Sequence, residues 1–76
     1  MIVRLLLWSL ADSKTTIDEL RAHLPEAANR TWISDENTDR FGTIETWDGV
    51  AGEFPQEIRD LIGKDPDIAE EFDVEV

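Results

Sequence analysis

The fold is decided by residues Thr31–Asp48, which read TWISDENTDRFGTIETWD. Two tryptophans, Trp32 and Trp47, lie on either side of a polar turn, and the residues around them alternate in character with the period of a strand. We therefore predict a β-hairpin with strands at Asn29–Ser34 and Phe41–Trp47. One face of this hairpin is small and apolar, and the other carries large aromatic and charged side chains. Such a sheet needs cover on both sides.

The register of this hairpin decides which side chains meet. If the turn is centred on residues 37–38, Trp32 lies opposite Thr43 and Arg30 lies opposite Glu45. A slip of one residue would turn one strand over relative to the other. In the expected register, Arg30 and Glu45 form a cross-strand pair of opposite charge on the face that carries the tryptophans.

The rest of the chain predicts two further strands and two helices. The strands are Met1–Leu10 and Ile68–Val76, and the helices are Thr15–Leu24 and Pro55–Ile62. The first strand is apolar on both faces, which is typical of a central strand. The resulting β-α-β-β-α-β order predicts a single domain over residues 1–76. Its fold class is α+β and ferredoxin-like, with two helices on one face of a four-stranded antiparallel sheet.

Alternation also predicts which side chains share each face of the sheet. We expect the helices to cover the face of Val3, Leu5, Leu7, Ile33, Ile44, Phe72 and Val74. They would do so with Ile17, Leu20, Leu24, Ile58 and Leu61. We expect the other face to collect Ile2, Arg4, Leu6, Trp8, Arg30, Trp32, Phe41, Glu45 and Trp47.

No third helix is predicted to cover this second face. Leaving its large apolar side chains in water would forfeit roughly 1.5–3 kcal/mol for each of them. A monomer of 8.7 kDa also buries only about 60% of the surface of its extended chain. Because a large exposed apolar patch usually marks an interface, we expect a homodimer in which two such faces meet and form a barrel.

The charge of the chain excludes several partners. It has 18 Asp and Glu against 7 Lys and Arg, for a net charge of −11. Binding to nucleic acid or to an anionic membrane requires a basic surface, so we expect neither partner. The acidity favours solubility, and adaptation to high salt is the alternative. The absence of cysteine and of a signal-peptide pattern favours a cytoplasmic location.

The sequence resembles the dimeric α+β barrel superfamily, and within it the YdhR-like monooxygenase family. The resemblance is carried by Trp32 ahead of an acidic turn, by Gly42 followed by the aromatic Trp47, and by Phe72-Asp73-Val74. Members include cofactor-independent monooxygenases that act on aromatic or polyketide-like substrates, and also proteins with no established activity. The resemblance therefore implies a dimer, no cofactor, and a pocket for a small aromatic ligand between sheet and helices or at the dimer interface. It supplies no catalytic residue.

Each candidate site residue has a functional and a structural interpretation. The aromatic residues Trp8, Trp32, Trp47 and Phe41 either line a pocket for a flat ligand or pack at the interface. Arg4 or Arg30 either orients an anionic oxygen or serves, with Glu45, as a buried ion pair. His23, the only histidine, is suited to acid-base chemistry, but a single helical histidine is more often a boundary residue.

The remaining acidic residues predict no metal site. Asp35, Glu36 and Asp39 lack the spacing of a calcium loop and are interpreted as a solvated turn. The acids of the last strand, Glu70, Glu71, Asp73 and Glu75, are interpreted as a solvated strand edge or as the rim of an interface. Two functional classes therefore stay open, a cofactor-free monooxygenase-like enzyme and a non-catalytic dimeric module that binds a ligand or a protein.

Overall fold

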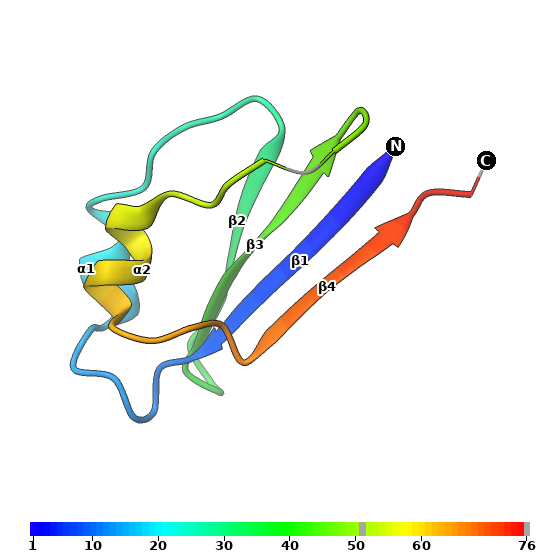
Figure 1. The fold of residues 1–76 in the computed structure, drawn as a ribbon. Helices are drawn as coiled ribbons and strands as arrows, with labels where there is room; N and C mark the ends of the chain where they lie inside the picture. Colours follow the sequence, from blue (N-terminus) through cyan, green and yellow to red (C-terminus); the bar gives the residue numbers. More distant parts are fainter. Residues whose placement is uncertain (51, 76) are drawn as a thin grey trace.

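A computed structural model describes residues 1–50 and 52–75 and has an α+β fold. Its elements are β1 (Ile2–Ser9), α1 (Ile17–Arg21), β2 (Arg30–Asp35), β3 (Arg40–Trp47), α2 (Gln56–Ile62) and β4 (Ile68–Asp73). The four strands form one antiparallel sheet in the order β2-β3-β1-β4, with both helices beside the same face (Figure 1). This topology confirms the predicted fold class and is compatible with a ferredoxin-like fold.

The predicted hairpin register is confirmed. Trp32 pairs with Thr43, and Arg30 pairs with Glu45. β1 lies between β3 and β4, as its two apolar faces indicated. Because residues directly opposite each other in an antiparallel sheet point to the same face, this register fixes the composition of both faces.

Both helices are short and end at recognisable signals. α1 begins after Thr16, whose side chain accepts a hydrogen bond from the Glu19 N–H at 3.2 Å. It ends at Arg21, three residues before the predicted end, and the His23 N–H then bonds to Leu20 O in a tighter turn. α2 ends at Gly63, which has a φ of 85° and so adopts the left-handed conformation that favours glycine.

The last strand is an exposed edge. All six residues of β4 are exposed, so the helices do not reach over it. The chain continues to pair for one more residue, because the Val74 N–H donates to Met1 O at 3.0 Å. The predicted strand extended to Val76, which lies outside the described residues. Within the described part of the chain, no helix is both long and apolar enough to cross a membrane.

The predicted division of side chains between the two faces is right, but the assignment of the helices to one of them is wrong. Leu6, Trp8 and Phe41, which were expected to face away from the helices, are at most 3% exposed and pack with the buried helix residues. Those helix residues are Ile17, Leu20, Ile58 and Ile62, with Leu24 and Leu61 partly buried beside them. The hydrophobic core therefore lies on the tryptophan-bearing face.

Helix length accounts for this difference. α1 has 5 residues and α2 has 7, so each brings only two fully buried side chains to the core. Large rings are needed to fill the space between the sheet and such short helices, because protein interiors are close-packed. Trp8 and Phe41 supply this volume, whereas the aliphatic side chains of the other face are smaller.

We call the uncovered side of the sheet the open face. Its side chains are Val3, Leu5, Leu7, Thr31, Ile33, Ile44, Thr46, Ile68, Glu70 and Phe72, with Ser9, Asp35 and Arg40 at one end and Val74 beyond the end of β4. Phe72 is 53% exposed and Ile44 is 40% exposed, and both were predicted to be covered by helices. The open face is therefore apolar and has no cover within the protomer.

Asp67, the residue before β4, is hydrogen-bonded to the end of β1. Its carboxylate accepts a hydrogen bond from the Ser9 N–H at 2.6 Å and lies 3.2 Å from Lys64 Nζ. The hydrogen bond from Ser9, followed by the contact with Lys64, holds the pKa of Asp67 below its usual value. A carboxylate with a lowered pKa contributes stability above its unfolded pKa and loses that contribution as pH falls through its folded pKa.

We therefore predict that Asp67→Asn lowers the melting temperature at pH 7 and reduces the loss of stability in acid. The difference from the wild type should be complete above about pH 4 and should shrink as pH falls further. Thermal melts between pH 7 and pH 2.5 measure this, with Asp12→Asn as an exposed control. A difference that does not change with pH would contradict the stated role of the charge.

Candidate functional site

The helix-covered face of the sheet has an apolar half and a charged half. The helices stand beside one half, where Leu6 and Trp8 join the core, and the connection from β3 to α2 crosses near the other half (Figure 1). Under this connection, three charged side chains from three adjacent strands meet. They are Arg4 on β1, Glu45 on β3 and Arg30 on β2, and we call them the charge cluster.

Each carboxylate oxygen of the charge cluster is held by a different arginine. Arg4 places Nε 2.9 Å and Nη2 2.8 Å from Glu45 Oε1, and Arg30 places Nε and Nη2 each 2.9 Å from Glu45 Oε2. The side chain of Glu45 is 0% exposed, that of Arg30 is 8% exposed and that of Arg4 is 13% exposed. The structure thus confirms the Arg30–Glu45 pair and adds Arg4 to it.

Aromatic rings surround the two guanidinium groups. Arg4 Cζ lies 5.6 Å from the centroid of the Trp47 ring, and Arg30 Cζ lies 5.6 Å from that of Trp32. Both distances are within the range of cation–π attraction. Aromatic rings therefore flank both guanidinium groups, which strengthens the interactions between the charges.

Two contributors to the site were not predicted from the sequence. Phe54 is buried between Trp8 and Trp32, with ring centroids 5.1 and 5.7 Å away, and Arg30 Cζ lies 5.8 Å from its ring. Gly52 O accepts a hydrogen bond from Arg4 Nη1 at 2.7 Å. The sequence signal for Phe54 is an aromatic residue directly before the proline that begins α2.

Gly52 also allows the connection to pass close to a tryptophan. A Cβ atom at this position would lie 2.8 Å from Cη2 of Trp47, closer than real side chains approach. A residue without a side chain is therefore required for the Gly52 carbonyl to reach Arg4 over the Trp47 ring.

The three tryptophans do not line one pocket. Trp8 is 0% exposed, and its N–H donates to Lys64 O at 3.0 Å, so it cannot contact another protein. Trp32 stacks on Phe41 and donates to Pro25 O at 3.2 Å. Trp47 lines a separate cavity of about 270 Å³, and its buried N–H has no hydrogen-bond partner among the described residues. The interpretation of Trp8 as an interface residue is therefore wrong, whereas Trp32 and Trp47 are only partly buried.

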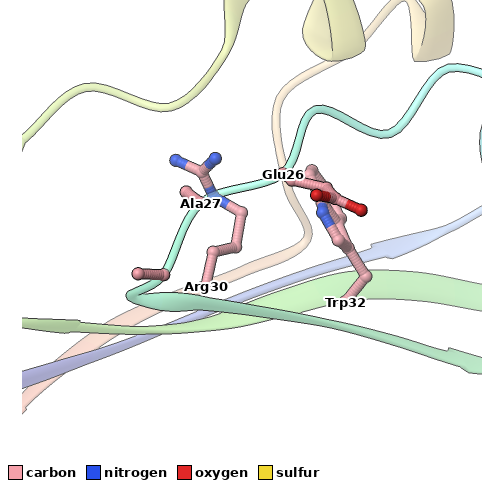
Figure 2. A pocket seen from close by; sticks show the side chains of 5 residues that line it. Glu26, Ala27, Arg30 and Trp32 are labelled. Atoms are coloured by element: carbon pink, nitrogen blue, oxygen red, sulfur yellow. The ribbon is translucent and has the colours of Figure 1, made fainter.

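A cavity of about 380 Å³ lies beside β2, and we call it the Arg30 cavity. It is lined by Glu26, Ala27, Ala28, Arg30 and Trp32, of which Arg30 and Trp32 rise from the strand next to each other (Figure 2). A second cavity of about 360 Å³ borders Arg4 and includes Gly52, Phe54 and Arg59. The two arginines of the charge cluster therefore border different cavities.

The other predicted candidates lie elsewhere. His23 is exposed and lines a cavity of about 160 Å³ with Glu57, Ile58 and Leu61, none of which belongs to the charge cluster. In the hairpin turn, hydrogen bonds from Thr38 and Arg40 hold the pKa of Asp35 below its usual value. Glu36 lies 3.0 Å from Arg21, so two of the three turn acids are paired with arginine.

The charge cluster predicts a severe effect of removing the central carboxylate. Glu45→Gln leaves two arginine charges buried without a counter-charge, which typically costs about 3–5 kcal/mol. We expect a loss of unfolding free energy of this size in urea titrations followed by circular dichroism. Glu57→Gln, which removes an exposed carboxylate from α2, is the control and should change the value little. A loss below about 1 kcal/mol would contradict the interpretation that the Glu45 carboxylate is shielded from water.

Searches against protein-family models and against curated proteins gave no match to this chain. The resemblance to the YdhR-like family therefore stays a prediction. Functional inference for this protein rests on its fold and on the geometry of the charge cluster, the open face and the cavities.

Proposed function

We propose that this protein functions as a homodimeric binding module, in which the open face of one protomer packs against the open face of a second copy. The observation that carries the proposal is that the open face is apolar and uncovered in the protomer. Contiguous apolar surface of this kind is characteristic of interaction sites. The proposal retains the homodimer expected from the sequence, but places its interface on the open face instead of the tryptophan-bearing face.

Surface area supports a partner. The protomer exposes 5084 Å², whereas area scaling for 8.7 kDa gives about 4,700 Å² for a stable monomer. A sheet of four strands, each six to eight residues long, has a projected area on the order of 400 Å². Its accessible surface is larger because side chains protrude from it. A standard interface buries about 800 Å² of accessible surface on each partner. The whole open face, rather than a part of it, is therefore needed for a stable contact.

A second copy fits this surface better than a partner of opposite charge. Among the side chains that point to the centre of the open face, only Glu70 is charged. Six of the 7 Lys and Arg residues form ion pairs within the protomer. A copy of the chain thus has few cations to offer in salt bridges between protomers, but it offers an equally wide apolar sheet. A two-fold axis would place the two open faces together.

The contents of the open face favour a binding module over an enzyme with an aromatic lumen. In the proposed dimer, the space between the sheets is filled mainly by aliphatic side chains, whereas the tryptophans stay inside each protomer. The monooxygenase-like activity implied by the resemblance stays a prediction. Oxygen uptake with quinol substrates, measured with an oxygen electrode, tests it separately from the dimer.

A single charge placed on the open face should dissociate the dimer. Phe72 is 53% exposed and lies on an edge strand, so Phe72→Glu is tolerated in the protomer but would be buried without a partner in the interface. We expect light scattering to give a dimer for the wild type and a monomer for this variant at micromolar concentration. Ala69→Glu, which adds the same charge to the other face of β4, should leave the dimer intact. A wild-type monomer would overturn the proposal.

The dimer should tighten as salt is added. Each protomer carries a net charge of −11, and the repulsion between two such protomers is screened over about 10 Å in 0.1 M salt but over about 3 Å in 1 M salt. We therefore expect the dissociation constant from sedimentation equilibrium to fall between 0.1 and 1 M NaCl. A dissociation constant that rises with salt would show that opposite charges hold the protomers together, and would contradict the apolar interface.

A further inference from the structure

Arg30 has hydrogen-bonding capacity that the charge cluster does not use. Its side chain is only 8% exposed, and its Nε and Nη2 atoms are engaged by Glu45. Within the described part of the chain, Nη1 has no hydrogen-bond partner. The terminal nitrogens of Arg30 point away from β2 beside the cavity (Figure 2). Nη1 is not among the buried unpaired side-chain atoms, so it reaches the cavity and can donate to an acceptor there.

The charge of the cluster points to the same kind of acceptor. Two arginines share one carboxylate, so the cluster carries a surplus of one positive charge in an otherwise acidic protein. Buried charges are stable when they are paired and hydrogen-bonded. A second carboxylate, placed against the free edge of Arg30, would match the planar guanidinium in shape and would balance the charges.

The opposite side of the Arg30 cavity carries a negative charge. Glu26 lines the cavity, and its carboxylate lies on the side of Trp32 rather than that of the Arg30 guanidinium in Figure 2. Glu26 is exposed, and no ion pair joins it to Arg30 among the described residues, so a positive group that enters the cavity can reach its carboxylate. Between these two charges the wall is formed by Ala27, Ala28 and the ring of Trp32.

We propose that the Arg30 cavity binds a small zwitterion of the amino-acid class. The ligand carboxylate would bond to Arg30, its ammonium group would face Glu26, and its apolar side chain would lie along the alanines and Trp32. The cavity volume of about 380 Å³ falls at the lower end of the range for small-molecule sites, which suits a ligand of this size. This proposal goes beyond the homodimer and does not depend on it.

The cavity wall is held in place before any ligand arrives. Pro25 O accepts from Trp32 Nε1 at 3.2 Å, and Ala27 O accepts from the Arg30 N–H at 3.2 Å. Asn29 Nδ2 donates to Thr46 O at 3.0 Å, which fastens the end of the same segment to β3. Because residues 25–29 are anchored at three points, binding would require little additional ordering.

Matched ligands test the two charges separately. We would titrate the protein with leucine, with 4-methylpentanoate, which lacks the amino group, and with 3-methylbutylamine, which lacks the carboxylate. Phenylalanine, 3-phenylpropionate and 2-phenylethylamine form a second set with a larger side chain. Calorimetry or ligand-observed NMR should show that at least one amino acid binds, and that removing its carboxylate weakens binding by about tenfold or more. Removing its amino group should weaken binding by about fivefold.

Variants assign each charge to its residue. Glu26→Gln changes an exposed position, so folding is not at risk, and it should remove the preference for the amino acid over its amine-free analogue. Arg30→Met should abolish binding of both the amino acid and its amine-free analogue. Arg59→Met, which removes an arginine from the neighbouring cavity, should leave binding unchanged.

Three results would overturn the zwitterion site. They are the absence of binding by both amino acids, equal binding of each amino acid and its amine-free analogue to the wild type, and an unchanged preference in Glu26→Gln. If Arg30→Met fails to fold, the proposal is still tested by comparing how Glu26→Gln binds each amino acid and its amine-free analogue. Because Phe72→Glu lies on the opposite face of the sheet, amino-acid binding by that variant separates a failure of the dimer from a failure of this site.

Discussion

The buried carboxylate of Glu45 is the constraint on which much of the structure depends. It lies on β3 and is bonded to Arg4 on β1 and to Arg30 on β2, so it joins the three strands that the helices and connections cover. A buried ion pair adds little net stability compared with apolar packing, but one left incomplete is costly. A slip of one residue in the hairpin would send Glu45 to the open face and leave both arginines unpaired. The cluster thus acts against wrong registers more than it adds to stability.

The sequence predicted the order of the elements, the hairpin register and the two sets of side chains, because each depends on local alternation. It did not predict which set lies under the helices, because both sets are largely apolar. Charged residues usually face water, so Arg4 and Glu45 in one set gave no sign that this set lies under the helices. Pairing between the arginines and Glu45 removes the preference for water. Whether these residues pair depends on the strand register and cannot be seen in the composition. The stronger signal was side-chain volume, since a 5-residue and a 7-residue helix leave a space that large rings such as Trp8, Phe41 and Phe54 fill.

The candidate site was only partly predictable for a related reason. Arg4, Arg30, Glu45 and Trp32 lie on strands, where period and register place them. The other parts of the site come from connections that have no period, namely Phe54, the carbonyl of Gly52 and the segment that carries Glu26. Their positions follow from hydrogen bonds to strand residues distant in sequence, such as the bond from Trp32 Nε1 to Pro25 O. No local sequence pattern predicts such hydrogen bonds.

The acidity of the chain affects how two protomers approach each other, because the ion pairs within the protomer leave mainly carboxylates on the surface. Six of the 7 basic residues are engaged in ion pairs within the protomer, so the surplus of carboxylates is directed outward. Two copies therefore repel each other in orientations that bring their acidic surfaces together. The open face is mainly apolar and carries few charges, so under the proposed dimer the same composition that opposes non-specific association favours one defined contact. In turn, the surplus positive charge of the charge cluster lies on the other side of the sheet, where each arginine borders a cavity. The two surfaces use alternate residues of the same strands, as Leu5 beside Arg4 and Ile44 beside Glu45 illustrate. The proposed dimer contact and the proposed ligand site can thus be altered independently by substitutions one residue apart.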